Sequence, residues 1–278
     1  MLEPWAIGVF TSVDAGLGAG LAAVRSLGVP SVQLHAPQPA TRQRAAEIRA
    51  QFAEAGVTVT CVFCGYAGES YETIPIVKET VGLVPPATYE ARLTETKEIA
   101  DFAHALGVEA VGMHIGFVPE DDGDPTFARV VAAAQAVCDY IAPRGQRLHL
   151  ETGQETADGL LHFFEAVGRD NLAINFDPAN MILYGSGEPI AALEKVGAHV
   201  RSCHCKDARW AARPGEEWGV EMPLGEGDVG LERYLRTLHA VGYRGPLTIE
   251  REISGPDQIR DIKLAVDRLV ALRSAILG

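Results

Sequence analysis

Short apolar segments alternate along the chain with longer stretches that have the periodicity of amphipathic helices. Val, Ile, Leu and Phe are frequent in the short segments, and this composition is typical of buried β-strands. The starts of neighbouring segments are most often about 26 residues apart, which suits one strand, one helix and two short loops. We therefore predict eight strands, over residues 5–10, 31–35, 57–63, 110–114, 147–151, 173–177, 200–206 and 246–250.

The order of these elements predicts the fold class. Helix signals lie between the strands: Asp158, for example, precedes the stretch GLLHFFEAV, which stops at Gly168. Eight such units without a linker rich in Pro, Gly or Ser predict an α/β fold, a closed (β/α)8 TIM barrel that occupies residues 1–278 as a single domain. An open doubly wound sheet is the alternative, but the glycines at positions 16, 18 and 20 lack the spacing of a dinucleotide-binding turn.

Two connections are much longer than the others, residues 64–88 and residues 207–228. The first contains three prolines, and the second contains Trp210 and Trp218. Both follow strands, so in a barrel both lie at the carboxyl-terminal mouth, where substrate lids usually form. We expect the two connections to cover the mouth, with simple surface decoration as the alternative.

The chain is acidic. Its 278 residues include 37 Asp and Glu against 24 Lys and Arg, which gives a formal net charge of −13. This balance disfavours nucleic acids and anionic membrane surfaces as partners, and no apolar run is long enough to cross a bilayer. The first residues lack the pattern of a secretory signal, so we expect a cytoplasmic protein in which the five cysteines are reduced.

Polar, chemically capable residues stand at the ends of the predicted strands. Alternate residues of a strand point to opposite faces, so Leu148 and Leu150 oppose Glu151, and Ile174 and Phe176 oppose Asp177. The apolar face should pack against the helices, which leaves the polar face toward the barrel axis. The residues at or near strand ends are His35, His114, Glu151, Asp177, His204 and Glu250.

Three carboxylates, those of Glu151, Asp177 and Glu250, should therefore converge at the mouth. Buried carboxylates so close together need a compensating positive charge. With His204 as a fourth ligand, the set suits one divalent cation: Mn²⁺ or Co²⁺ is favoured, and Mg²⁺ or Zn²⁺ is possible. Ion pairs with Lys206, Arg147 and Arg251 are the alternative.

Cysteines offer a competing metal site, because Cys61 and Cys64 form a CxxC pattern and Cys203 and Cys205 flank His204. The alternation of faces argues against this site, since Cys203 and Cys205 should point away from His204 and into the helix layer. We predict that they are small core residues.

Several segments together resemble the xylose isomerase-like TIM-barrel superfamily, and within it the sugar phosphate isomerase/epimerase family. Ketose 3-epimerases, hydroxypyruvate isomerase and inosose dehydratase belong to this family, and endonuclease IV is a distant relative. The resemblance is carried by LHLETGQET (148–156), NFDPANMILYG (175–185), VRSCHCKDAR (200–209), PLGEGDVG (223–230) and PLTIERE (246–252).

The resemblance places the family's metal ligands on Glu151, Asp177, His204 and Glu250, and its acid/base pair on Glu151 and Glu250. It also implies pairing of barrels, so a homodimer is expected. One position departs from the pattern: relatives often have a His three residues after the strand-six Asp, where this chain has Asn180. This departure argues against a multinuclear zinc site and the phosphodiester chemistry of endonuclease IV.

The function that we predict is isomerisation or epimerisation of a ketose, aldose or related polyol ketone through an enediolate that the metal stabilises. Glu151 and Glu250 would exchange the proton, while Lys206 would stabilise an enolate oxygen or hold a hydroxyl, or instead pair with Asp207. An inosose-type dehydratase is the closest alternative; an endonuclease IV-like phosphodiesterase and a non-catalytic sugar-binding barrel are further ones. Candidate contacts to substrate hydroxyls are His35, His114, Glu155, Asn180 and Arg209.

Overall fold

Eight parallel strands form a closed barrel, because the last strand pairs with the first. In this computed structural model, which describes residues 2–14 and 18–278, β11 pairs with β8 on one side and with β1 on the other. The barrel is therefore confirmed, and the open doubly wound sheet is excluded. The barrel strands are β1 (Ile7–Ser12), β3 (Ser31–His35), β4 (Thr58–Phe63), β5 (Ala110–Met113), β6 (Arg147–Glu151), β7 (Leu172–Phe176), β8 (Val200–Cys205) and β11 (Leu247–Ile249).

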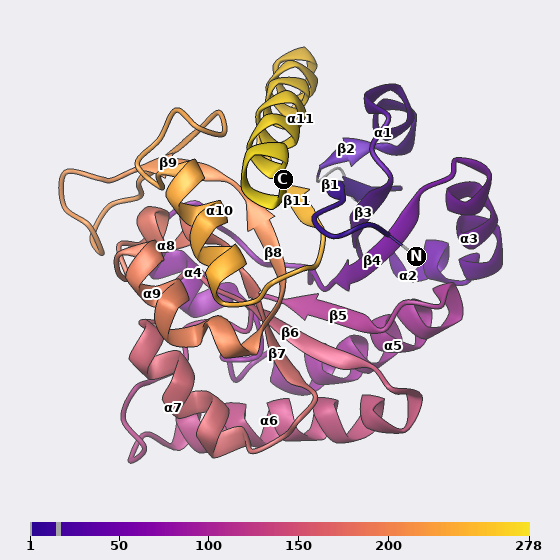
Figure 1. Cartoon of the computed structure of the whole chain (residues 1–278). Helices are drawn as coiled ribbons and strands as arrows, with labels where there is room; N and C mark the ends of the chain where they lie inside the picture. Colours follow the sequence, from indigo (N-terminus) through magenta and orange to yellow (C-terminus); the bar gives the residue numbers. More distant parts are fainter. Residues whose placement is uncertain (1, 15–17) are drawn as a thin grey trace.

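One or two helices follow each barrel strand and surround the sheet (Figure 1). The longest, α11, closes the described chain and contacts β1 and β11. The helices are α1 (Leu21–Leu27), α2 (Pro39–Arg42), α3 (Ala45–Glu54), α4 (Ile74–Thr80), α5 (Tyr89–Leu106), α6 (Pro125–Ile141), α7 (Ala157–Val167), α8 (Pro178–Tyr184), α9 (Pro189–Val196), α10 (Leu231–Ala240) and α11 (Pro256–Leu277), with 3-10 turns at Ala142–Arg144 and Gly197–His199.

The predicted helix after β6 is present, but its cap differs from the prediction. The side chain of Thr156, and not that of Asp158, caps the helix by accepting a hydrogen bond from the amide of Gly159, and Asp158 lies within the first turn. Gly168 ends the helix in the left-handed conformation, as predicted. Of the glycines considered for a dinucleotide-binding turn, Gly16 lies outside the described residues, whereas Gly20 immediately precedes α1.

The two faces of the barrel strands bury different side chains. Leu148, Leu150 and Ile174 are almost fully buried in the apolar core between sheet and helices. On the inner face, Phe10 and Phe63 pack with Cys61 and Ala110. The inner face also carries a buried polar set, which comprises Gln33, His149, Asn175, Ser202, His204 and Thr248.

Both long connections reach the mouth of the barrel. The ring of Tyr71, in the connection that contains α4, lies 6.0 Å from the ring of His114, which follows β5. In the other connection, the ring of Trp218 lies 4.5 Å from that of Tyr184, on α8. Aromatic side chains from both connections thus stand beside residues that follow barrel strands.

Three short strands were not predicted. The two-residue β2 (Ala19–Gly20) pairs in parallel with the end of β1, while β9 (Asp207–Arg209) and β10 (Val220–Met222) form an antiparallel pair within the second long connection.

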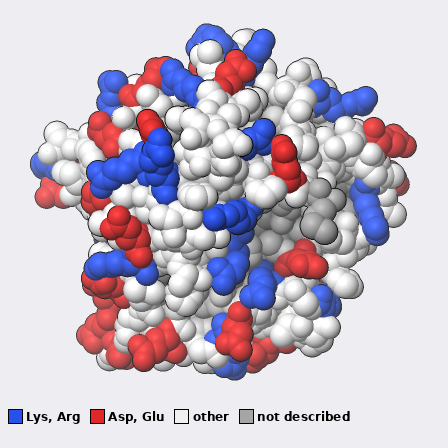
Figure 2. All heavy atoms as spheres, viewed as in Figure 1, with Lys and Arg blue, Asp and Glu red and all other residues white. Residues whose placement is uncertain are grey.

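The side of the molecule seen in Figure 2 carries acidic and basic side chains interspersed with each other. Among the described residues, no helix has the length and apolar character that crossing a membrane requires.

A buried carboxylate shapes the loop that precedes α10. Asp207 is 1% exposed, and its Oδ1 accepts hydrogen bonds from the amides of Ala208 and Val229, while its Oδ2 accepts from those of Gly225 and Gly227. A side chain at Gly227 would clash with this carboxylate. Gly227 of the motif PLGEGDVG is therefore required because the loop lies close to the carboxylate of Asp207.

We expect Asp207→Ala to lower the free energy of unfolding by about 2 to 4 kcal/mol, because several buried amide donors lose their acceptor. Urea unfolding measures this change. Asp267→Ala, at an exposed position of α11, is the matched control and should change stability by less than about 0.5 kcal/mol. Equal effects of the two substitutions would contradict this role of Asp207.

Candidate metal centre

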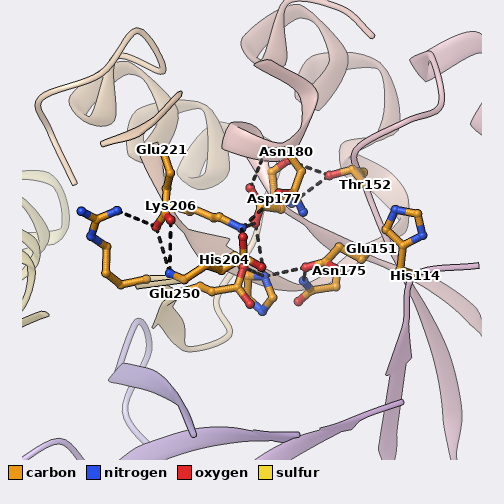
Figure 3. Close-up of polar contacts among 12 residues, drawn as sticks. His114, Glu151, Thr152, Asn175, Asp177, Asn180, His204, Lys206, Glu221 and Glu250 are labelled. Carbon is orange, nitrogen blue, oxygen red and sulfur yellow. Dashed lines mark hydrogen bonds and ion pairs between the residues drawn. The ribbon is translucent and has the colours of Figure 1, made fainter. Parts of the chain in front are cut away.

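Four side chains from neighbouring strands meet at the carboxyl-terminal end of the barrel (Figure 3). Glu151 is the last residue of β6, Asp177 directly follows β7, His204 lies in β8, and Glu250 directly follows β11. One ligand atom from each of the four lies within 4.8 Å of the others. The predicted convergence of these residues is therefore present in the fold.

The imidazole of His204 lies at the centre of this cluster. Its Nδ1 is 2.7 Å from Glu151 Oε1, 3.3 Å from Glu250 Oε2 and 3.4 Å from Asp177 Oδ2. The imidazole itself is completely buried, and its ring packs against those of Phe10 and Phe63, with centroids 5.6 and 5.3 Å away. Apolar side chains inside the barrel thus pack against the imidazole ring.

A chain of amide side chains fixes the orientation of His204. Its Nε2 lies 2.8 Å from Gln33 Oε1, and Gln33 in turn donates to Asn175 Oδ1 at 3.3 Å. Gln33 Oε1 can only accept, so Nε2 carries the proton and donates it in this bond. In the neutral imidazole, Nδ1 therefore has a lone pair that faces the carboxylates, the arrangement that a metal-ligating histidine requires.

Two buried atoms of the cluster lack hydrogen-bond partners among the described residues: His204 Nδ1 and Asp177 Oδ2. The carboxylate oxygens near Nδ1 are within reach, but none is aligned with the ring to accept a hydrogen bond. Buried polar atoms without a partner are costly, and these two face each other across the cluster. A cation between them would satisfy both.

The charges of the cluster point to the same requirement. Burial lowers the pKa of His204, but the carboxylates of Glu250 and Glu151 outweigh burial and hold this pKa well above its ordinary value. Burial raises the pKa of Glu151. Burial alone would raise the pKa of Glu250, but the positive charges of His204 and Lys206 together have the larger effect. The pKa of Glu250 therefore lies well below its usual range. The carboxylates thus attract a positive charge to the centre of the cluster.

The donor set fits a divalent cation. Three carboxylates and one neutral imidazole are suitable ligands for Mn²⁺, Co²⁺, Mg²⁺ or Zn²⁺, and they project from the ends of adjacent strands, which hold them in place. The alternative of ion pairs with arginines does not hold, since Arg251 pairs with Glu221 and Asp261, and Arg147 donates to a backbone carbonyl. Lys206 alone among the three expected bases contacts the cluster.

The competing cysteine site does not form. Cys203 and Cys205 are completely buried in the main apolar core, as predicted, and Cys61 packs inside the barrel with Phe10 and Phe63. Burial raises the pKa of the Cys64 thiol to about 12, which disfavours the thiolate that binds metals.

Lys206 does not pair with Asp207, the alternative considered from the sequence. Its Nζ contacts Glu250 Oε2 at 2.9 Å and Glu252 Oε2 at 3.0 Å, and it donates to Asn180 Oδ1 at 3.1 Å. Asp207 instead binds backbone amides. The positive charge of Lys206 is therefore directed toward the acidic cluster.

The two histidines predicted at the mouth differ in how their rings are bonded. His114 is buried: its Nδ1 accepts from the amide of Gly116, and its Nε2 lies 3.1 Å from the hydroxyl of Tyr184. Burial lowers the pKa of His114 to about 4. His35 is half-buried, and its Nδ1 donates to the carbonyl of Ala36 at 3.1 Å. Its Nε2 lies against Gly65, where a side chain would clash with the ring.

The other proposed substrate contacts are dispersed. Asn180 joins the cluster through Lys206, and its backbone amide donates to Asp177 Oδ1. Glu155 follows β6 and accepts a hydrogen bond from Gln154. Arg209 is exposed on β9 and donates to the carbonyl of Glu226; among the described residues it has no hydrogen bond or ion pair with the four-residue cluster. His149 on β6 bonds to Ser202 at 2.8 Å and is buried inside the barrel.

Several residues of the site were missed from the sequence. Gln33 alternates with Val32 and Leu34 on β3, so its inward position could have been recognised. Thr152, whose hydroxyl bonds both the amide and the carbonyl of Asp177 at 2.8 Å, gave no such signal. The same is true of Glu252, which reaches Lys206 from beyond the end of β11.

Comparisons with known proteins agree with this architecture. The family model for the xylose isomerase-like TIM barrel matches residues 21–272. The crystal structure of a xylose isomerase domain protein from Planctomyces limnophilus is 54% identical, covers 99% of each chain and superposes with a TM-score of 0.97. No curated protein matches the chain in sequence.

More distant structures share the fold. A xylose isomerase-like TIM barrel protein from Mycobacterium smegmatis, solved in complex with magnesium, is 18% identical, with 99% of this chain and 98% of that chain covered and a TM-score of 0.73. A D-psicose 3-epimerase from Clostridium cellulolyticum, solved with D-tagatose, is 16% identical, with 98% and 99% covered and a TM-score of 0.69.

The environment of Glu155 predicts a pH-dependent stability. Burial raises the pKa of Glu155 from 4.5 to about 8, although its backbone and Gln154 lower it. Between these values the unfolded chain releases the proton while the folded chain keeps it, so this group makes the free energy of unfolding fall as pH rises. In Glu155→Gln this contribution is absent.

We therefore expect Glu155→Gln to gain stability relative to the wild type as the pH is raised from about 5 to about 8 in the presence of a chelator. Urea unfolding at a series of pH values measures the difference. Glu165→Gln, at an exposed position of α7, is the control and should run parallel to the wild type. A constant difference between Glu155→Gln and the wild type across this range would refute the raised pKa.

Proposed function

The chain belongs to the xylose isomerase-like TIM barrel family, and we propose that it is a divalent-metal-dependent sugar isomerase or epimerase. The proposed substrate is a ketose, an aldose or a related polyol ketone. One observation carries the proposal: the ligand atoms of Glu151, Asp177, His204 and Glu250 converge within 4.8 Å. The ketose epimerase among the similar structures supports the same class of reaction.

Glu151, Asp177, His204 and Glu250 would hold the cation. His204 is suited to this role because its Nε2–H donates a hydrogen bond to Gln33, so its Nδ1 faces the three carboxylates. When bound, the cation would supply Lewis-acid polarisation of the carbonyl and the neighbouring hydroxyl of the substrate. The buried position of the cluster excludes bulk water and strengthens this electrostatic effect.

Glu151 and Glu250 are the proposed proton-transfer pair. They extend from β6 and β11, with β7 and β8 between them, so they approach the centre from different directions. One carboxylate would remove the proton from the carbon beside the carbonyl, and the other would return a proton to the opposite face of that carbon. This exchange epimerises the substrate, whereas return of the proton to the neighbouring carbon isomerises it.

Lys206 is proposed to act through Glu250. Its ammonium group contacts Glu250, Glu252 and Asn180, so its three N–H donors already have acceptors in the protein. It would keep Glu250 ionised and hold its carboxylate in place. We therefore treat Lys206 as a positioning residue, in preference to a direct contact with an enolate oxygen.

The mouth of the barrel offers groups for a polyhydroxylated substrate. The Nδ1 of His35 donates to a backbone carbonyl, so its Nε2 can accept a hydrogen bond from the substrate. Glu155 is protonated at neutral pH and can both donate and accept a hydrogen bond. Tyr71 and Trp218, from the two long connections, would limit the access of water to the reacting carbon. These are the chain's proposed substrate contacts and covering residues.

The direct test is exchange of substrate hydrogen with solvent. A panel of ketoses, inosose and hydroxypyruvate is incubated with the protein and Mn²⁺ in D₂O, and deuterium incorporation is followed by NMR. We expect the wild type to incorporate deuterium beside the carbonyl of at least one compound. Glu151→Gln and Glu250→Gln should each slow this exchange by about 10² to 10⁴ fold, because each lacks one partner of the acid/base pair.

Glu165→Gln is again the control and should exchange at the wild-type rate, while a chelator should abolish exchange until Mn²⁺ is added back. The mass of the product distinguishes the dehydratase alternative, since only dehydration loses water. Undiminished exchange in both glutamine variants would eliminate the proposed proton-transfer pair.

A further inference from the structure

The ammonium group of Lys206 is surrounded by oxygen atoms from four residues. Its Nζ lies 2.9 Å from Glu250 Oε2, 3.0 Å from Glu252 Oε2, 3.1 Å from Asn180 Oδ1 and 3.9 Å from Asp177 Oδ2. The side chain is 1% exposed, although lysines usually extend their charged group into solvent. Figure 3 shows Lys206 directed toward the acidic cluster.

These surroundings have the composition of a binding site for a hard divalent cation. Three carboxylates and one carboxamide oxygen are the ligand types that Mg²⁺, Mn²⁺ and Ca²⁺ prefer. Two of the four residues, Asp177 and Glu250, also belong to the candidate metal centre, and the same oxygen atoms, Oδ2 and Oε2, face both His204 Nδ1 and Lys206 Nζ. The ammonium group therefore stands next to the metal centre, where two metal ions could share carboxylates.

We propose that the ammonium group of Lys206 takes the place of a second cation and thereby limits the centre to one divalent ion. This inference rests on the proposed function, since it takes the four-residue cluster as the metal centre. It concerns a separate property, the number of ions per chain.

The geometry also explains why removal of the amine should open a second site. Metal–oxygen bonds of about 2.0 to 2.6 Å are shorter than the contacts of the ammonium group, so the oxygens must move inward. The side chain of Glu252 is 54% exposed and can make this movement, while Asn180 is held near the site by α8. With the amine gone, the carboxylates of Asp177, Glu250 and Glu252 would retain negative charge for an incoming ion.

The test counts Mn²⁺ ions per folded chain. Wild type and Lys206→Met are brought to equilibrium dialysis against increasing Mn²⁺, and bound manganese is determined by elemental analysis. We expect one ion per chain for the wild type and two for Lys206→Met. Since the two ions would share carboxylates, the electron paramagnetic resonance spectrum of Lys206→Met should show spin coupling that is absent from the wild type.

Two further variants serve as controls for the loss of charge and for the change in side-chain volume. Lys195→Met also removes a lysine charge, but its partner is Asp158 on the protein surface, so this variant should bind one ion. Lys206→Gln keeps most of the side-chain volume and should also bind two. If loss of the ammonium group destabilises the fold, Mn²⁺ should raise the melting temperature of both Lys206 variants more than that of the wild type.

The outcomes separate this inference from the proposed function. Two ions in the wild type, or one ion in the wild type and in both Lys206 variants, overturn the inference and leave the metal centre intact. No bound ion in the wild type contradicts the metal centre and, with it, the inference that Lys206 limits this centre to one ion.

Discussion

Electrostatic repulsion among three closely spaced carboxylates at the carboxyl-terminal end of the barrel governs the rest of the site. Glu151, Asp177 and Glu250 surround a single imidazole nitrogen at 2.7 to 3.4 Å. Two unit charges about 4 Å apart interact by about 4 kcal/mol at the effective dielectric constant typical of proteins. Such a cluster needs positive charge inside it, and Lys206 supplies part of this charge from one side. The unpartnered Nδ1 of His204 and Oδ2 of Asp177 indicate where more is required.

The fold holds these side chains in place through contacts that the reaction itself does not use. Gln33 fixes the tautomer of His204, and the rings of Phe10 and Phe63 support its face. Thr152 bonds both backbone groups of Asp177. Asp207, which follows Lys206 in the chain, accepts hydrogen bonds from backbone amides of the loop before α10 and so fixes the conformation of this loop. The precision of the centre therefore comes from neighbouring strands and from the side chains that bond to their ends.

Much of this arrangement could be predicted because a parallel barrel strand has two distinguishable faces. The alternation in LHLE and INFD was enough to direct Glu151 and Asp177 inward, and it also placed Cys203 and Cys205 in the core. Contacts that depend on loop conformation could not be predicted. The sequence left open an ion pair between Lys206 and Asp207. In the structure, Lys206 contacts Glu252 and Asp207 binds backbone amides. The cap at Thr156 was missed for a similar reason, since Ser, Thr and Asp are all good helix caps and only the backbone decides between them.

Anomalous diffraction from crystals grown with Mn²⁺ can show whether one divalent cation lies among these four side chains. We expect one strong peak within about 2.0 to 2.6 Å of a ligand atom from each of Glu151, Asp177, His204 and Glu250. A map without a peak at this position, at saturating Mn²⁺ and with the cluster well ordered, would contradict this expectation.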